Sequence, residues 1–100
     1  MATQLQRVGV TADLRVHVPR NDRGTLADGT HDAVSRVPGV DAVHAVEMVG
    51  VHPDLNTVST DVRVELTLAV DAADERRVAA ALRDGTGVQR VDVRDVGPPD

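Results

Sequence analysis

The chain has 100 residues, a formal net charge of −5 at pH 7 and 41% hydrophobic residues, a composition typical of one soluble globular domain. Because Cys, Phe, Tyr and Trp are all absent, a disulfide, a thiolate nucleophile, a Cys-ligated metal centre and an aromatic platform for stacked bases are excluded. The acidic balance argues further against nucleic-acid binding, since contact with phosphates requires a positively charged surface. No apolar run approaches the roughly 18 residues of a membrane helix, and residues 1–7 lack the apolar core of a signal peptide, so we expect a cytoplasmic protein without a membrane partner.

The first strand has the clearest pattern. Residues 7–18 alternate between polar and apolar side chains without a break, which predicts a strand with one buried and one open face. Pro19 ends this strand, and residues 20–24 form a polar loop. The first helix should begin at Thr25, whose hydroxyl can accept a hydrogen bond from the amide of Asp28. The Pro-Gly pair that follows the helix should end it.

The second half of the chain repeats this layout. Residues 40–52 and 57–71 form a long predicted hairpin around a polar turn. Asp71 is the expected N-cap of the second helix, and residues 88–96 are the last strand. Residues 97–100 should be a disordered tail.

The elements follow in the order strand, helix, strand, strand, helix, strand. With two right-handed crossovers, this order predicts a single ferredoxin-like domain over residues 1–96. We expect an α+β sandwich whose antiparallel sheet has the strand order 4-1-3-2, with both helices on one face.

The second strand, residues 40–52, lies at an edge of this sheet, yet its apolar residues do not alternate. Pairing His52 with Thr57 puts the carboxylate of Glu47 in the core, which is costly for a charged group. A shift of one residue puts Glu47 opposite Arg63 but turns valines toward the open face. A β-bulge near Glu47 would resolve this conflict, and so would a partner that covers the strand.

We favour the partner, because a long unprotected edge strand invites pairing with another chain. The lack of aromatic side chains favours it too, since a core of Val, Leu and Ala buries less apolar surface than one with large rings. The sequence therefore predicts a homo-oligomer, dimeric or larger. Its predicted interface consists of Val43, Val46, Met48, Val49 and Val51.

Histidines and carboxylates are the only ordinary metal ligands in the chain. His17 and His52 lie at the C-terminal ends of two parallel strands with a third strand between them, and Asp54 follows in the adjoining turn. These three residues are the candidate metal site. The alternative is that both histidines are solvated at the strand ends, because their spacing matches no zinc motif.

The loop of residues 20–24 joins a strand end to a helix N-terminus, where amides and the helix dipole can hold an anion. Arg20 and Arg23 are the candidate anion-binding residues, and Asp22 opposes them. In position the loop resembles the phosphate-binding loop of acylphosphatases. Because their glycine-rich sequence ending in Phe-Arg is missing, their catalytic activity is not implied.

Residues 37–43, with the sequence Val-Pro-Gly-Val-Asp-Ala-Val, resemble the helix-to-strand junction of several ferredoxin-like regulatory modules. These include ACT domains, the effector domains of Lrp-type regulators and metal-chaperone domains, although the Cys-x-x-Cys pair of the chaperones is missing. The use of Arg without Lys, of Val without Ile and of Asp as the main acid resembles the composition of haloarchaeal cytoplasmic proteins. Neither serine lies on the strand-to-helix elbow that a nucleophilic serine needs.

These patterns favour a non-enzymatic, self-associating binding or regulatory module, and no motif identifies a ligand or a cofactor. The alternative is a metal- or anion-binding site assembled between subunits, with or without enzymatic activity. Its residues would be His17, His52, Asp54, Arg20 and Arg23.

Overall fold

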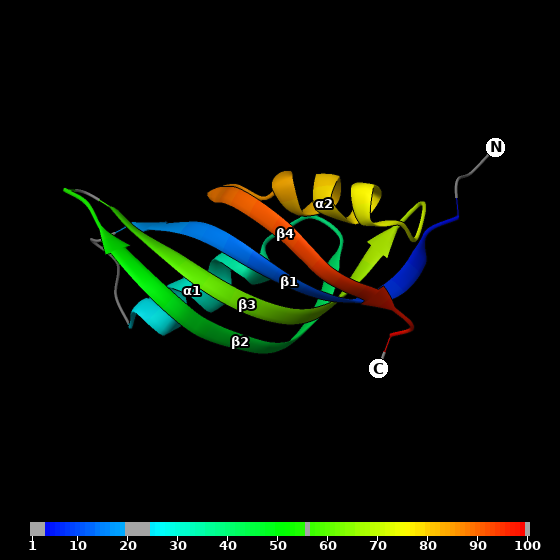
Figure 1. Ribbon diagram of the computed structural model, residues 1–100, viewed down its shortest axis with the longest axis horizontal. Coiled ribbons are helices and arrows are strands. Elements are labelled where there is room, and N and C mark those ends of the chain that lie inside the picture. Colours follow the sequence, from blue (N-terminus) through cyan, green and yellow to red (C-terminus); the bar gives the residue numbers. More distant parts are fainter. Residues whose placement is uncertain (1–3, 20–24, 56, 100) are drawn as a thin grey trace.

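A computed structural model describes residues 4–19, 25–55 and 57–99 (Figure 1). In chain order the elements are β1 (Gln6–Pro19), α1 (Leu26–Ser35), β2 (Val40–Pro53), β3 (Thr57–Val70), α2 (Glu75–Arg83) and β4 (Val88–Gly97). The four strands form one antiparallel sheet in the order β2-β3-β1-β4. This is the predicted strand order counted from the other edge, and the α+β class with two helices is confirmed.

The core lies between one face of the sheet and the two helices (Figure 1). β1 shows the predicted alternation in full, since its inward side chains from Val8 to Val18 are at most 4% exposed. α1 contributes Val34, and α2 contributes Val78 and Leu82, to the same buried cluster. Both helices therefore cover one face of the sheet, and we call the opposite face the open face.

Each helix begins at a side-chain cap. Thr25 caps α1 as predicted: its hydroxyl accepts a hydrogen bond from the Asp28 amide at 3.1 Å, and the Asp28 carboxylate accepts one from the Thr25 amide. The prediction that Asp71 caps α2 is wrong, because Asp74 is the N-cap and accepts a hydrogen bond from the Arg77 amide at 2.9 Å. Asp71 pairs with the guanidinium of Arg77 instead. Neither of these two helices of the described residues is long and apolar enough to cross a bilayer.

β2 departs from regular alternation because it contains three β-bulges, in which Asp41, His44 and Val49 are the extra residues. Each bulge moves the register by one residue, so inward-facing side chains recur at every third position rather than at every second. These residues are Val40, Val43 and Val46. Bulges, the alternative to a partner, therefore account for the irregular pattern of this strand.

The two registers that the sequence left open meet at the bulge at His44: before it, Val43 lies opposite Leu66, as the register that pairs His52 with Thr57 requires. After it, Glu47 lies opposite Arg63, as the other register requires. The pairing of His52 with Thr57 is wrong, because His52 lies opposite Ser59. The bulge at Val49 shifts the register once more, so no single register extends along β2.

β4 pairs with β1 and extends one residue beyond the predicted boundary, since Gly97 lies opposite Gly9. The chain then passes close to β1, because the carbonyl oxygen of Pro98 would lie 2.7 Å from a Cβ atom on Gly9. A side chain at position 9 would therefore displace the chain that follows β4.

Candidate functional site

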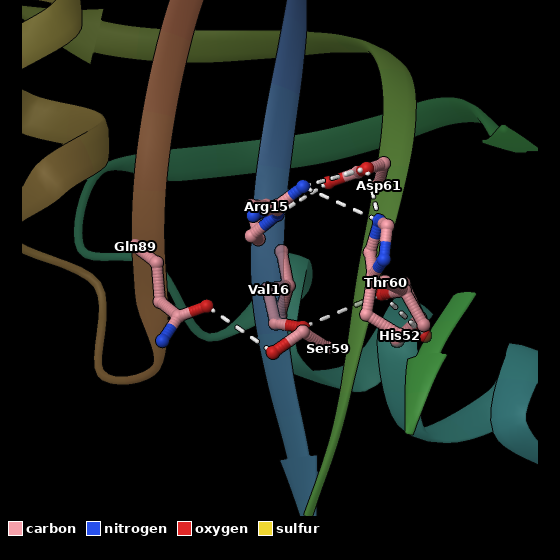
Figure 2. Close-up of polar contacts among 8 residues, drawn as sticks. Arg15, Val16, His52, Ser59, Thr60, Asp61 and Gln89 are labelled. Atoms are coloured by element: carbon pink, nitrogen blue, oxygen red, sulfur yellow. Dashed lines mark hydrogen bonds and ion pairs between the residues drawn. The ribbon is translucent and has the colours of Figure 1, made fainter. Parts of the chain in front are cut away.

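Polar side chains gather on the open face, where three strands bring Arg15, His52 and Asp61 together (Figure 2). Arg15 donates to Asp61 through Nε at 2.7 Å and through Nη2 at 3.1 Å. His52 Nε2 lies 2.7 Å from the Asp61 carboxylate. The hydrogen bond from Arg15, followed by the one from His52, holds the pKa of Asp61 far below its usual value. Asp61 is therefore an ionised carboxylate engaged by two partners.

A second group lies on the same face around Asp13. Its carboxylate accepts hydrogen bonds from Arg63 Nε at 2.9 Å and from Arg94 Nε at 2.7 Å. The hydrogen bond from Arg63, supported by that from Arg94, outweighs desolvation and lowers the pKa of Asp13. Arg63 also faces Glu47 of β2. Ion pairs at this level of exposure each contribute little to stability.

A shallow hollow of about 320 Å³ lies between these two groups. It is lined by Asp13, Leu14, Val49, Asp61, Val62, Arg63, Arg90, Asp92 and Arg94. Arg90 and Asp92 are the two charged residues of this lining whose side chains make no ion pair or hydrogen bond with any described residue. The charges of the open face are therefore paired around Asp13 and Asp61, whereas Arg90 and Asp92 of β4 have no charged partner within the described residues.

The predicted metal ligands His17 and His52 lie in one row across the open face, on either side of Ser59. Because neighbouring strands are about 4.8 Å apart, their backbones are separated by about 10 Å. Asp54 lies in the turn after β2, where its carboxylate accepts a hydrogen bond from the Leu55 amide at 2.8 Å. Within residues 4–19, 25–55 and 57–99, no three His, Asp or Glu side chains are grouped to hold a metal ion. A metal site built from these residues would need ligands from another chain.

Ser59 lies next to His52 and Asp61, a neighbourhood that the sequence analysis missed because it depends on the bulge in β2. Ser59 Oγ donates to Gln89 Oε1 at 3.2 Å across β1 and makes no hydrogen bond with His52 (Figure 2). A serine nucleophile needs a base within hydrogen-bond reach. The three side chains therefore do not form a nucleophile and its base.

The predicted anion-binding residues, Arg20 and Arg23, lie outside the described residues. A hollow of about 730 Å³ lies between α1 and the turn that precedes β4. Two of its charged groups, Asp32 and Arg36, pair with each other at 2.9 Å. Every buried side-chain nitrogen or oxygen among the described residues has a hydrogen-bond partner, so this hollow offers a ligand no unpaired buried group.

The predicted interface residues are divided between the two faces of β2. Val49, the extra residue of a bulge, lines the hollow of the open face and is 67% exposed. The other four face the helix side, and we call them the β2 shelf: Val43, Val46, Met48 and Val51. Met48 is 37% and Val51 is 47% exposed. Beside the shelf, α1 and β2 enclose a hollow of about 380 Å³ that is lined in part by Val43, Val46 and Met48.

No family model, curated protein or solved structure matches this chain. Its function therefore has to be argued from two features of its own geometry. These are the paired charges of the open face and the apolar β2 shelf.

Proposed function

We propose that the chain is a non-enzymatic, ferredoxin-like binding or regulatory module of the cytoplasm that self-associates through the β2 shelf. The exposure of Met48 and Val51 carries this proposal, because both side chains face the helix side of the sheet and yet remain more than a third exposed. The order of elements and the order of strands are those of a ferredoxin-like sandwich.

The dimensions of α1 explain why the shelf stays uncovered. α1 has 10 residues and β2 has 14. A helix rises about 1.5 Å per residue and a strand about 3.3 Å, so α1 spans about 15 Å beside a strand of up to about 46 Å. The helix therefore covers only part of the strand, and apolar side chains left in this way at a sheet edge are typical of an interaction surface.

The shape of the shelf favours a second copy of the chain as the partner. Met48 lines the hollow between α1 and β2 together with Val43 and Val46, and the exposed Val51 lies beyond it. An apolar surface with an exposed side chain beside a hollow can contact a copy of itself across a two-fold axis. The three bulges restrict backbone pairing of β2 to short stretches, so the contact rests on side chains.

The open face supports the non-enzymatic part of the proposal. Asp61 and Asp13 are each held by two partners, and a carboxylate with a lowered pKa is a poor general base. Their arrangement is that of a solvated lattice of cross-strand ion pairs.

The mass of the protein in solution tests this proposal. Because the chain has no Trp or Tyr, light scattering needs refractive-index detection rather than absorbance at 280 nm. We expect the native chain to have at least twice its single-chain mass of 10.6 kDa. The double variant M48D/V51D should lower that mass, because it places charges in the apolar contact.

The variant V49D is the matched control. It makes the same kind of change on the same strand, but on the open face, so it should leave the mass unchanged. A native chain of 10.6 kDa at all concentrations would overturn the proposal. So would a mass that M48D/V51D and V49D leave equally unaffected.

A metal site between subunits is the second candidate, favoured by the placement of His17 and His52 in one row of the open face. It requires Asp54 or carboxylates of a second copy as further ligands, and Arg20 and Arg23 for an anion. Divalent zinc, nickel and manganese would then raise the melting temperature, and H17A/H52A would abolish the rise. A melting temperature that no metal changes, or a rise that H17A/H52A retains, removes this candidate.

A further inference from the structure

Two rows of charged side chains cross the open face at right angles to the strands. In the first row, Asp61 of β3 lies opposite Arg15 of β1, and Arg15 lies opposite Arg90 of β4. The second row has the reverse signs and consists of Arg63 of β3, Asp13 of β1 and Asp92 of β4. In each row, therefore, β3 and β1 carry opposite charges, while β1 and β4 carry like charges.

The inner pairs of both rows form ion pairs, but the outer residues do not. Arg15 pairs with Asp61 at 2.7 Å in the first row, and Arg63 pairs with Asp13 at 2.9 Å in the second row. Arg90 and Asp92 are exposed, and their side chains make no ion pair or hydrogen bond within the described part of the chain. Each row thus ends at the sheet edge on a charge that repels its neighbour on β1.

The position of these residues leaves them accessible. β4 is an edge strand. Its register with β1 shifts at Gln89 and at Arg94, and these two residues have no partner on β1. Between them the stretch Arg90–Val93 is regular, so it can accept a short neighbouring strand.

We propose that β4 is a second self-association surface, on which two copies of the chain pair antiparallel around a two-fold axis through Val91. This register places Arg90 opposite Asp92 of the second copy, and Asp92 opposite Arg90 of the second copy. Each row then continues into the other sheet with a matched pair at the junction. The charge pattern is self-complementary only in the antiparallel arrangement, because a parallel pairing in register would place like charges opposite each other.

This inference rests on the proposed self-association and extends it. The β2 shelf and β4 lie at opposite edges of the sheet, so both contacts can form on one chain at the same time. A chain with two such surfaces forms assemblies larger than a dimer.

Charge reversal on β4 tests the inference by sedimentation velocity with interference optics. In the variants R90D and D92R, positions 90 and 92 carry the same charge, so like charges lie opposite each other across the two-fold axis. This should weaken the β4 contact on the order of tenfold or more. Within one chain both changes replace a like-charge pair with an opposite-charge pair against β1, so neither should lower the melting temperature. Loss of association by these variants therefore does not come from loss of folding.

Two further samples restore complementarity. The double variant R90D/D92R exchanges the charges of positions 90 and 92, so opposite charges again lie across the two-fold axis, and it should associate like the native chain. An equimolar mixture of R90D and D92R should form assemblies larger than a dimer, although each variant alone does not. R76D on α2 is the matched control, since Arg76 is exposed and makes no ion pair within the described residues.

The outcomes separate this inference from the proposed function. With both contacts present, the native chain exceeds a dimer, and M48D/V51D and R90D each reduce it to a dimer. If M48D/V51D reduces the mass and R90D acts no differently from R76D, the β4 contact is refuted and the proposed function stands. If the native chain is a monomer, both are refuted.

Discussion

Asp13 of β1 lies directly opposite Asp92 of β4, so two carboxylates face each other across neighbouring strands. Arg63 and Arg94 neutralise Asp13, whereas the Asp92 side chain has no such partner among the described residues. Like charges in this position destabilise a sheet. The structure therefore contains a repulsion that a single chain does not relieve.

Replacing Asp92 with Thr should stabilise a single chain, because it removes the repulsion and adds a residue that favours strands. Asp95→Thr is the matched control, since Asp95 lies on the same strand but opposite Thr11. We expect D92T to raise the free energy of unfolding by about 0.5 kcal/mol more than D95T does. Urea unfolding followed by far-UV circular dichroism, at a concentration where the chain is monomeric, measures the difference. Equal effects of the two substitutions would show that the carboxylate pair costs nothing.

Asp61 should make stability sensitive to acid. Its pKa is lowered in the folded chain by Arg15 and His52, so the stabilisation is complete above the unfolded pKa of about 3.9 and is lost as the pH falls below it. Asp61→Asn should lower the free energy of unfolding at pH 7 by about 1 kcal/mol, a value kept small because solvent screens a partly exposed group. Stability measured between pH 5 and pH 2 should then fall less steeply in D61N than in the native chain. Parallel curves for the two proteins would contradict this role of Asp61.

Gly39, between α1 and β2, should not tolerate a side chain. Its φ is +90°, and a Cβ atom would lie 3.0 Å from the carbonyl oxygen of Ala69. Gly39→Ala should therefore cost about 1–2 kcal/mol. Gly50→Ala is the control, because the nearest atom to its Cβ would be 3.5 Å away, on Asp61. Thermal unfolding of both variants checks this prediction, which fails if G39A melts no lower than G50A.

Local patterns in the sequence predict most of this fold. The alternation of residues 7–18 gives β1 and its buried face, and the hydroxyl of Thr25 marks the start of α1. Two aspartates could each have capped α2, and no local rule distinguishes Asp71 from Asp74. In the structure β3 ends at Val70 and α2 begins at Glu75, so Asp74 is the residue at the capping position.

β2 is the part that a rule of alternation could not predict. Its side-chain period is changed by bulges at Asp41, His44 and Val49, and each bulge depends on pairing with β3. The recurrence of Val40, Val43 and Val46 at every third position was the available signal. Since the neighbourhood of His52, Ser59 and Asp61 results from the last bulge, it could not be predicted either.

The central claim is that the chain assembles with copies of itself, and its mass in solution tests that claim most directly. Light scattering with refractive-index detection should be carried out over a hundredfold range of protein concentration, on the native chain and on M48D/V51D. We expect the native chain to have a mass of at least twice 10.6 kDa, and the mass of M48D/V51D to be lower. A constant mass of 10.6 kDa for the native chain over the whole range would contradict the account.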